Sequence, residues 1–465
     1  MIARLDVFMV TALLSFLGLA GAVPSQAETK PAPATKVARP ATVFPTVLTP
    51  PAPSPPEQAE IKLSLRDAIE TALGNNYQIR LQLARLEQAR AQAATQLGAL
   101  LPVLSSTVNG GNQKFFLGQI GGSPVATNAF DLYDLRTNFN MNLYSVSLIE
   151  RWHASRRGTE AAVLDTEAMK RDTAATVSLL YLEALRAEAL HAASESNVRL
   201  DTELLTLVQN RQAAGVATAL DAARAQSQLE HERQRLLALK ADQDRAQLSL
   251  IRGLGIPFEV RLQLTDRLGL LEVPIPTTEE ALQVAMQNRV ELKAQQQRVK
   301  LASLTLDSTT AERYPSLSAR GDVGLIGNQT DSTVVTHNVG VVLSVPFFDG
   351  QREGRVKEGR SQVNQEQIRL YDVIQQINLE VRQAVSTLVP ARAQVPAAER
   401  GLAAALREME LARERFVMLA SSNIELTNAQ TSVARGRDNW IEALFRFNAA
   451  RVNLARAQGR LDNLY

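Results

Sequence analysis

The 465-residue sequence contains no cysteine. This absence excludes a disulfide framework, a thiol nucleophile, a Cys-ligated zinc or iron–sulfur cluster, and a lipidated N-terminal cysteine. Aromatic residues are also scarce, at 5% of the chain, which is instead rich in Ala, Leu, Gln, Arg and Glu. This composition favours long, thin helical packing over a thick globular core.

Histidine and net charge are low as well. The four histidines share no metal-ligand spacing, so a packed or solvated imidazole is the better interpretation of each: His153, His191, His231 and His337. The formal net charge of +2 is too small for a nucleic-acid-binding surface. The sequence also lacks a nucleophile–base arrangement and a glycine-rich phosphate loop. We therefore expect neither an enzyme nor a bound cofactor.

The N-terminus has the pattern of an export signal. Arg4 precedes an apolar run from 7 to 22, and 25–27 (Ser-Gln-Ala) offers a small-x-small cleavage site. The alternative, a membrane anchor, needs a run of about 20 residues. We predict a signal peptide over 1–27. Proline then dominates 28–60, which predicts an extended periplasmic tail or linker.

Beyond the tail the sequence repeats itself. The segment 65–76 matches 278–289 at Ala68/Ala281, Ala72/Ala285 and Asn75/Asn288. The same offset of 213 positions carries Pro102 onto Pro315. Later the offset is 204, which pairs Arg211 with Arg415 and Gly255 with Gly459. We predict one duplicated layout, with halves at 61–270 and 271–465.

Each half is predicted to contain a helix, two strands, a long helix, a turn and a return helix. The first helix is expected from about 65 to 101 and its counterpart from about 278 to 313, each stopped by a proline. The proline-free stretch from 148 to 211 predicts a helix roughly 90 Å long, at about 1.5 Å per residue. After a turn at 214–216, Thr218 is the expected N-cap of the return helix.

In the second half, the long helix is expected from about 354 to 418. Pro390 and Pro396 lie inside it, so we expect a kink or break there. The segment 421–423 (Ser-Ser-Asn) is expected to cap the last helix, which should extend to about 457.

Four strands are predicted between these helices, at about 103–118, 130–146, 315–328 and 333–348. Polar and apolar residues alternate along them, as Asn138, Asn140 and Asn142 do with Phe139, Met141 and Leu143. Period-two alternation places one strand face in water and the other in an apolar medium. In a soluble protein the apolar face would cover a core, and hairpins packed on helices remain the alternative.

Charge and aromatic placement favour a membrane instead. Arg320 and Asp322 lie in mid-strand on the polar face. Aromatic residues bracket the strands as the two girdles of a transmembrane barrel do: Tyr144, Trp152, Tyr314, Phe347 and Phe348 at one end, and Phe115, Phe116, Phe130 and Tyr133 toward the other. Four strands cannot close a barrel, and open edges are not tolerated in hydrocarbon. Several subunits must therefore share one barrel.

Over residues 62–465 the chain resembles the TolC-like outer-membrane efflux proteins, the outer membrane factors. The resemblance rests on the duplicated layout, the Ala-rich segments 65–76 and 278–289, and the strand entries at Pro102 and Pro315. The segment 345–350 (Val-Pro-Phe-Phe-Asp-Gly) and an Ala-Gln pair after each turn add to it. The order and spacing of these features carry the resemblance.

The resemblance implies a mainly α-helical protein with a membrane β-barrel portion. Three copies would form a twelve-stranded barrel in outer-membrane lipid, continued by an α-helical barrel across the periplasm. Such a homotrimer conducts substrates passively from an inner-membrane pump through a periplasmic adaptor, in drug or metal efflux or type I secretion. Adaptors meet the helical tips, which here are Gly215, Val216 and Ala217, and Leu419, Ala420 and Ser421.

The family's gate uses acidic residues just after the second tip turn. By resemblance these positions fall at Glu425 and Asn428, of which only the first is acidic. A ring of three Glu425 carboxylates would form a negative constriction. Alternatively, Glu425 only favours the first turn of its helix through the helix dipole. Asp221 occupies the equivalent place in the first half, where Arg224 could pair with it.

Two other classes of protein stay open at this point. A soluble periplasmic coiled-coil scaffold or adaptor would explain the helices and the export signal, but not the duplicated strands with one apolar face. An exported enzyme would need a catalytic constellation that the sequence lacks. Dependence on detergent for solubility separates a membrane channel from both.

Overall fold

The computed structural model describes residues 60–460, apart from 122, 271–273, 330 and 419–422. The predicted signal peptide, and the proline-rich segment up to residue 59, lie outside the described residues. The predicted cap residues Ser421 and Ser422 do as well, and the last helix begins at Asn423.

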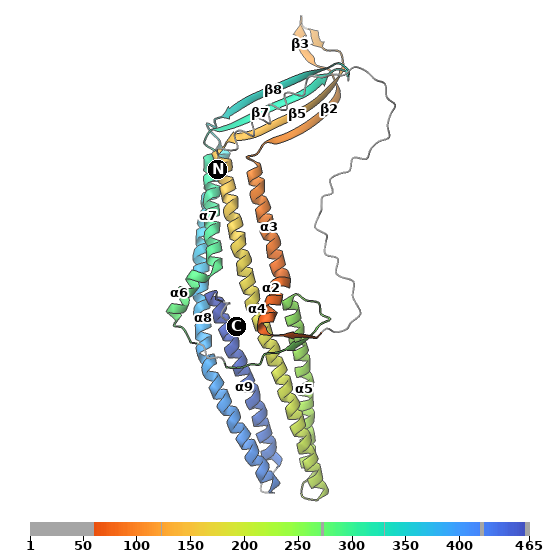
Figure 1. Cartoon of the computed structure of the whole chain (residues 1–465), viewed down its shortest axis with the longest axis vertical. Coiled ribbons are helices and arrows are strands. Elements are labelled where there is room, and N and C mark those ends of the chain that lie inside the picture. Colours follow the sequence, from red (N-terminus) through yellow and green to blue (C-terminus); the bar gives the residue numbers. More distant parts are fainter. Residues whose placement is uncertain (1–59, 122, 271–273, 330, 419–422, 461–465) are drawn as a thin grey trace, which may run out of the picture. The chain divides into compact units, whose positions relative to one another are not determined.

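The duplication appears as two sets of four helices with matching lengths. Each helix of the first half has a counterpart in the second, of 11, 22, 68 and 36 residues in turn. The first set is α2 Leu65–Asn75, α3 Tyr77–Gly98, α4 Val146–Ala213 and α5 Ala219–Leu254. The second set is α6 Thr278–Asn288, α7 Val290–Ala311, α8 Gly350–Val417 and α9 Asn423–Gln458. The helices α4 and α8 run uninterrupted from the end of a strand to a tip turn (Figure 1).

The predicted single helix at the start of each half is wrong, because each divides in two. Asn76, between α2 and α3, has extended backbone and accepts the N–H of Gln78 on its side-chain oxygen, which caps α3. Its Nδ2 donates to the carbonyl of Gly253 at 2.8 Å. Arg289 divides α6 from α7 and donates to the Glu380 carboxylate at 2.7 Å. Both breaks are held by groups more than 90 residues away in the chain.

At the two prolines of α8 a kink or a break was predicted; the break is wrong, and the kink stays a prediction. The helix continues from Gly350 to Val417 through Pro390 and Pro396. A proline inside a helix removes a backbone hydrogen bond and introduces a clash. Here Leu388, Ala391 and Val395 are at most 5% exposed and pack into one core on both sides of Pro390. Burial of this continuous face keeps the helix intact.

One four-stranded antiparallel sheet collects the long strands of both halves. Its order is β2-β5-β7-β8. The bounds are β2 Val103–Gln113, β5 Phe130–Tyr144, β7 Ser316–Gly327 and β8 Thr333–Ser344. The predicted first strand is therefore shorter than 103–118, and a small hairpin of β3 Phe116–Ile120 and β4 Ser123–Ala126 follows it. The two halves join where β5 pairs with β7, and β2 and β8 form the outer edges (Figure 1).

Three apolar cores hold the helices together. One combines α2, α4 and α5 and a residue of α9 with a parallel pair of short strands, β1 Glu60–Leu63 and β6 Arg261–Leu264. A second combines α6, α7, α8 and α9, and a third joins the ends of α4, α5, α8 and α9 near the turns. In the first core the single hydroxyl hydrogen of Tyr181 is shared between two acceptors, the Leu63 carbonyl at 3.0 Å and the Asp266 carboxylate at 2.9 Å.

Thr218 is confirmed as the N-cap of α5. Its hydroxyl accepts the backbone N–H of Asp221 at 3.2 Å, and the Asp221 carboxylate accepts the backbone N–H of Thr218 at 3.1 Å. This reciprocal capping box fixes the start of the return helix. Gly215 in the preceding turn has φ +72, a left-handed conformation that glycine adopts without steric cost.

Two glycines that end the return helices offer a matched test of the packing. Gly255 after α5 and Gly459 after α9 both have positive φ, so alanine at either position should cost about 1–2 kcal/mol of stability. A Cβ on Gly255 would also lie 2.6 Å from the Asn75 carbonyl oxygen, whereas on Gly459 the nearest atom would be 3.3 Å away. We expect Gly255→Ala to lower the thermal unfolding midpoint in detergent more than Gly459→Ala. Equal shifts would contradict this.

Candidate pore, membrane face and helical tips

The sheet presents one polar face, which is formed by in-register neighbours on all four strands. Asn138 on β5 lies opposite Ser105 on β2 and Asp322 on β7, and Asp322 lies opposite Asn338 on β8. Beside them, the guanidinium of Arg136 pairs with the Asp134 carboxylate at 3.3 Å and with that of Asp322. Charge in mid-strand is thus neutralised within the face, which suits the water-filled side of a barrel wall.

The opposite face of the same sheet is apolar and uncovered. Its side chains are exposed in the isolated chain, including Leu104 at 70%, Val108 at 78%, Val339 at 78%, Val341 at 62% and Leu343 at 63%. Contiguous exposed apolar surface of this kind marks a contact with protein or membrane. With the polar face on its other side, this sheet fits a barrel wall between lipid and water.

The five predicted interface aromatics lie where the strands meet the helices. Tyr144 ends β5, Tyr314 precedes β7, and Phe347 and Phe348 follow β8; all four are more than half exposed. Trp152 is on the second turn of α4 and is partly covered, with the Arg156 guanidinium 5.4 Å from its ring centroid. Their role at the membrane interface stays a prediction.

The tips carry exposed apolar side chains. Among the predicted tip residues, Gly215, Val216 and Ala217 form the α4–α5 turn, where Val216 is 57% exposed. The predicted residues Leu419, Ala420 and Ser421 lie outside the described part of the chain. The neighbouring side chains on either side of them are also exposed: Val417, Met418 and Ile424. Tip-to-tip docking of another helical protein would bury such a surface.

The three gate candidates differ in what surrounds them. Glu425 is exposed in the first turn of α9, with its carboxylate 3.6 Å from Arg415, and Asn428 is exposed one turn further along. Asp221 caps its own helix instead. Its hydrogen bonds with Thr218 hold the pKa of its carboxyl below the ordinary value, and Arg224 contributes only a minor attraction. Asp221 therefore has a structural role at the start of α5.

A contact between the two hairpin tips was not predicted from the sequence. The Arg211 guanidinium, in the last turn of α4, donates to the Phe416 carbonyl at 2.7 Å and lies 3.9 Å from the centroid of the Phe416 ring. Nearby, Nδ2 of Asn423 donates to the Asp221 carbonyl at 3.2 Å. We call these two contacts the tip clasp. Arg211 stands out in the sequence only as the repeat counterpart of Arg415.

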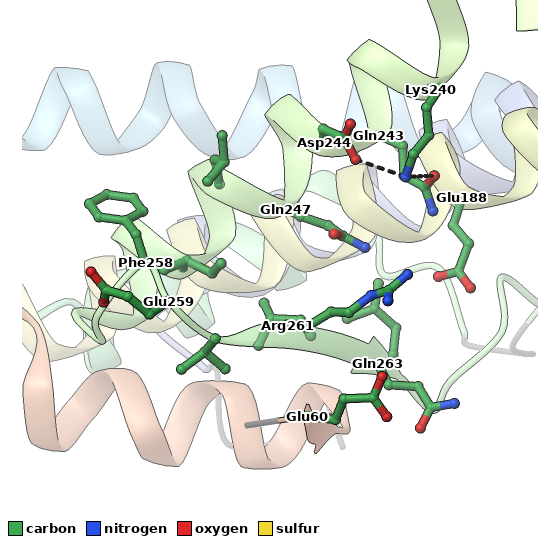
Figure 2. Close-up of a pocket in the computed structure, with 15 residues that line it drawn as sticks. Glu60, Glu188, Lys240, Gln243, Asp244, Gln247, Phe258, Glu259, Arg261 and Gln263 are labelled. Atoms are coloured by element: carbon green, nitrogen blue, oxygen red, sulfur yellow. Dashed lines mark hydrogen bonds and ion pairs between the residues drawn. The ribbon is translucent and has the colours of Figure 1, made fainter. Parts of the chain in front are cut away.

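A hollow of about 610 Å³ lies between α4, α5 and β6. Figure 2 shows charged and amide side chains around it, among them Glu188, Gln247 and Arg261. Lys240 is already paired, at 2.9 Å from the Asp244 carboxylate. The lining residues include no serine, threonine or histidine, so this hollow shows no nucleophile–base arrangement.

Two further observations concern only the described residues. Their His, Asp and Glu side chains nowhere gather in threes in a way that could hold a metal ion. None of their helices has an apolar stretch long enough to cross a membrane.

Comparison with known proteins gives consistent matches. A family model described as outer membrane efflux protein matches residues 68–256 and 281–460. The probable efflux pump outer membrane protein TtgC of Pseudomonas putida is 24% identical over 415 residues, covering 85% of this chain and 83% of that protein. The outer membrane channel CmeC of Campylobacter jejuni has a TM-score of 0.75 at 18% identity, covering 85% of each chain. The open state of MtrE of Neisseria gonorrhoeae has a TM-score of 0.71 at 18% identity, covering 85% of this chain and 88% of that one.

Because the chain has no native cysteine, spin labels on introduced cysteines can test the tip clasp. With labels at Gln212 and Val417, we expect Arg211→Ala to lengthen and broaden the measured distance distribution, since both the hydrogen bond and the ring contact are lost. Arg211→Lys should do so partially, because lysine keeps the charge without the planar contact. Arg415→Ala is the matched control, since its partner Glu425 belongs to the same hairpin. An unchanged distribution in Arg211→Ala would show that the clasp does not hold the tips.

Proposed function

This chain belongs to the outer membrane efflux protein family, and from that membership we propose that three copies assemble into its working form. The protein is an exit duct of the outer membrane that extends into the periplasm, a transport component of an efflux system. Compounds pass through it without chemical change, along the polar face of the sheet and between the helices below.

The observation that carries the trimer is the pair of free strand edges. β2 and β8 each leave one row of backbone N–H and C=O groups without a partner in the described chain. An unpaired backbone group costs several kcal/mol in hydrocarbon. The apolar face of the same sheet favours contact with lipid hydrocarbon, so the edges of the sheet would lie in hydrocarbon as well. Pairing β8 of one subunit with β2 of the next removes both edges, and three copies give the twelve strands of a closed barrel.

The duplication supports this pairing, because the chain already contains an equivalent one. The offset of 204 carries β5 onto β8 and the offset of 213 carries β2 onto β7, and the register of β2 on β5 matches that of β7 on β8. The pairing of β5 with β7 therefore supplies a template for β8 on the neighbour's β2. Asn138 opposite Asp322 translates into Val342 opposite Asn109 of the next subunit.

The helices support the same arrangement. In one chain α4 packs against α7 and α9 of the other half. Its counterpart α8 would make the equivalent contacts with α3 and α5. Within the described part of a single chain it makes none of comparable extent. We propose that α3 and α5 of the neighbouring subunit fill these places, so that the strand barrel continues into a helical barrel.

The partners follow from the position of the tips. The relatives TtgC and OpmQ carry names as outer membrane proteins of efflux or export systems. We propose that the exposed apolar tip side chains dock a periplasmic adaptor, which links the duct to an inner-membrane pump. Glu425 from three subunits then faces the narrowest point, where three negative charges would favour cations over anions.

The seam between subunits can be tested by disulfide formation in the membrane. We expect Asn109→Cys with Val342→Cys to give covalently linked dimers and trimers after oxidation, because directly opposite strand residues lie within disulfide range. Asn109→Cys with Asn338→Cys is the matched control. Its second cysteine is about 13 Å further along the strand, at about 3.3 Å per residue, and should stay unlinked.

Two outcomes would contradict the seam. Equal linking of both pairs would show that the strands slide or meet in another register. A protein that remains trimeric by mass, with neither pair linked, would show that β8 and β2 are not neighbours.

The gate proposal has its own test in planar bilayers. We expect Glu425→Gln to reduce cation preference and raise severalfold the concentration of Mg²⁺ that halves the current, since three charges leave the constriction. Glu70→Gln, which removes an exposed carboxylate paired with Arg66 on α2, is the control and should leave both quantities unchanged. Currents that do not respond to Glu425→Gln would retain the channel and dismiss Glu425 as its gate.

A further inference from the structure

A buried polar cluster lies inside the hairpin that α4 and α5 form. Ser194, Asn197 and Asp201 lie on one face of α4 and are 1%, 8% and 4% exposed. Glu232 on α5 faces them and is 7% exposed. Acidic residues are seldom this buried unless they are paired with a cation or hydrogen-bonded. Two carboxyl groups therefore share a site that is closed to water.

The carboxyl groups of Glu232 and Asp201 have different hydrogen-bond partners and different charged neighbours. Glu232 accepts the Ser194 hydroxyl at 2.8 Å and the Asn197 amide at 3.4 Å, and the Arg235 guanidinium is 3.8 Å away. Asp201, one turn beyond Asn197, forms no ion pair with any of the described residues. Burial, and then the charge of Glu232, raise the pKa of Asp201 to about 6, although Gln228 opposes this by a hydrogen bond.

The cluster also connects the first hairpin to α9 of the second. Arg235 pairs with the Asp438 carboxylate at 2.5 Å, and Arg437 donates to the Asn197 side-chain oxygen at 3.1 Å. Burial raises the pKa of Asp438, while Arg235 acts to lower it. Among the described residues, the charged group that acts on Asp201 is therefore Glu232, and the charged groups around Glu232 and Asn197 are Arg235 from α5 and Arg437 and Asp438 from α9.

The second hairpin has small residues at every equivalent position. The offset of 204 replaces Ser194, Asn197, Asp201 and Glu232 by Ala398, Gly401, Ala405 and Gly436. There the helices pack closely, since a Cβ on Gly436 would lie only 3.2 Å from the Cα of Leu402. At these four positions the first hairpin thus closes on titratable groups, and the second closes on small residues that carry no proton to exchange.

We propose that the cluster of Ser194, Asn197, Asp201 and Glu232 is a proton-responsive joint, which tightens the α4–α5 hairpin and its contact with α9 when Asp201 is protonated and loosens both when it is ionised. The joint lies about 18 Å from the end of α4, at 1.5 Å per residue. It would therefore change how firmly the first tip is held while leaving the second hairpin unchanged. This goes beyond the proposed exit duct, and its test needs no working channel.

The direction of the pH effect on the stability of the closed hairpin follows from the difference in the pKa of Asp201 between the closed and open forms. When the hairpin opens and water enters, Asp201 regains its ordinary pKa of 3.8, so the closed form binds more protons between that value and about 6. The closed form therefore loses stability as the pH rises through this window. Between pH 5.0 and pH 7.5 the opening equilibrium should shift by about tenfold toward the open form.

Hydrogen exchange of the full-length trimer in detergent measures this opening directly. Rates at the two pH values are first corrected for the intrinsic pH dependence of amide exchange. We expect peptides covering 190–205 and 225–240 to be about tenfold less protected at pH 7.5 than at pH 5.0. The equivalent peptides at 394–409 and 429–444 form an internal control and should change little. Equal change in both hairpins, or none in the first, would overturn the proposal.

Two substitutions test whether Asp201 is the titrating group that causes the pH response. Asp201→Asn keeps the shape without the ionisation, so the first hairpin should be at least as protected at both pH values as the parent protein is at pH 5.0, and its protection should no longer change with pH. Glu230→Gln is the control on the exposed side of α5, where Glu230 pairs with Arg233 at 2.9 Å, and should retain the pH response. A response that persists in Asp201→Asn would assign it to another group. If that variant fails to fold, the comparison of the two hairpins in the parent protein still decides the proposal.

Discussion

The backbone of a strand in hydrocarbon must have its hydrogen bonds satisfied, and this constraint shapes the whole molecule. Four strands with one apolar face end at two open edges, β2 and β8. No side chain can repair such an edge, so the repair must come from further copies of the chain. The same requirement applies to the helices, because helices that continue from the strands of a closed barrel must also be arranged around the barrel axis.

Duplication makes this closure possible with one kind of contact. The pairing of β5 with β7 inside the chain and the proposed pairing between chains are the same contact, repeated around the ring. For that to hold, strands and tips must meet at matching levels in both halves. The equal helix lengths meet this need: α4 and α8 have 68 residues each, and α5 and α9 have 36. Two prolines inside α8 have not altered its length.

The sequence predicted the elements that are set by periodicity and missed those set by distant contacts. Alternation along β5 and β7 predicted the polar and apolar faces, and the turn at 214–216 was predicted from its glycine. The helix breaks at Asn76 and Arg289 depend on Gly253 and Glu380, which no local pattern can place nearby. The tip clasp also depends on a distant contact, because Arg211 and Phe416 lie in different halves of the sequence. For Asp221 the local signal was a helix cap, while the proposed position of Glu425 at a pore depends on contacts between subunits, which no pattern within one sequence encodes.

Positions at which the two halves carry different side chains show where their contacts differ. A ring of six equal hairpins would have one set of contacts at every seam. Glu312 at the end of α7 bridges Arg151 and Arg355, which are repeat counterparts, whereas the equivalent position at the end of α3 is Ala99. Near the tips, an acidic interior in one hairpin stands against Ala398, Gly401, Ala405 and Gly436 in the other. In the proposed trimer the backbone would thus keep near-sixfold regularity for closure, while the side chains would reduce it to threefold and leave one hairpin in each subunit free to respond to pH.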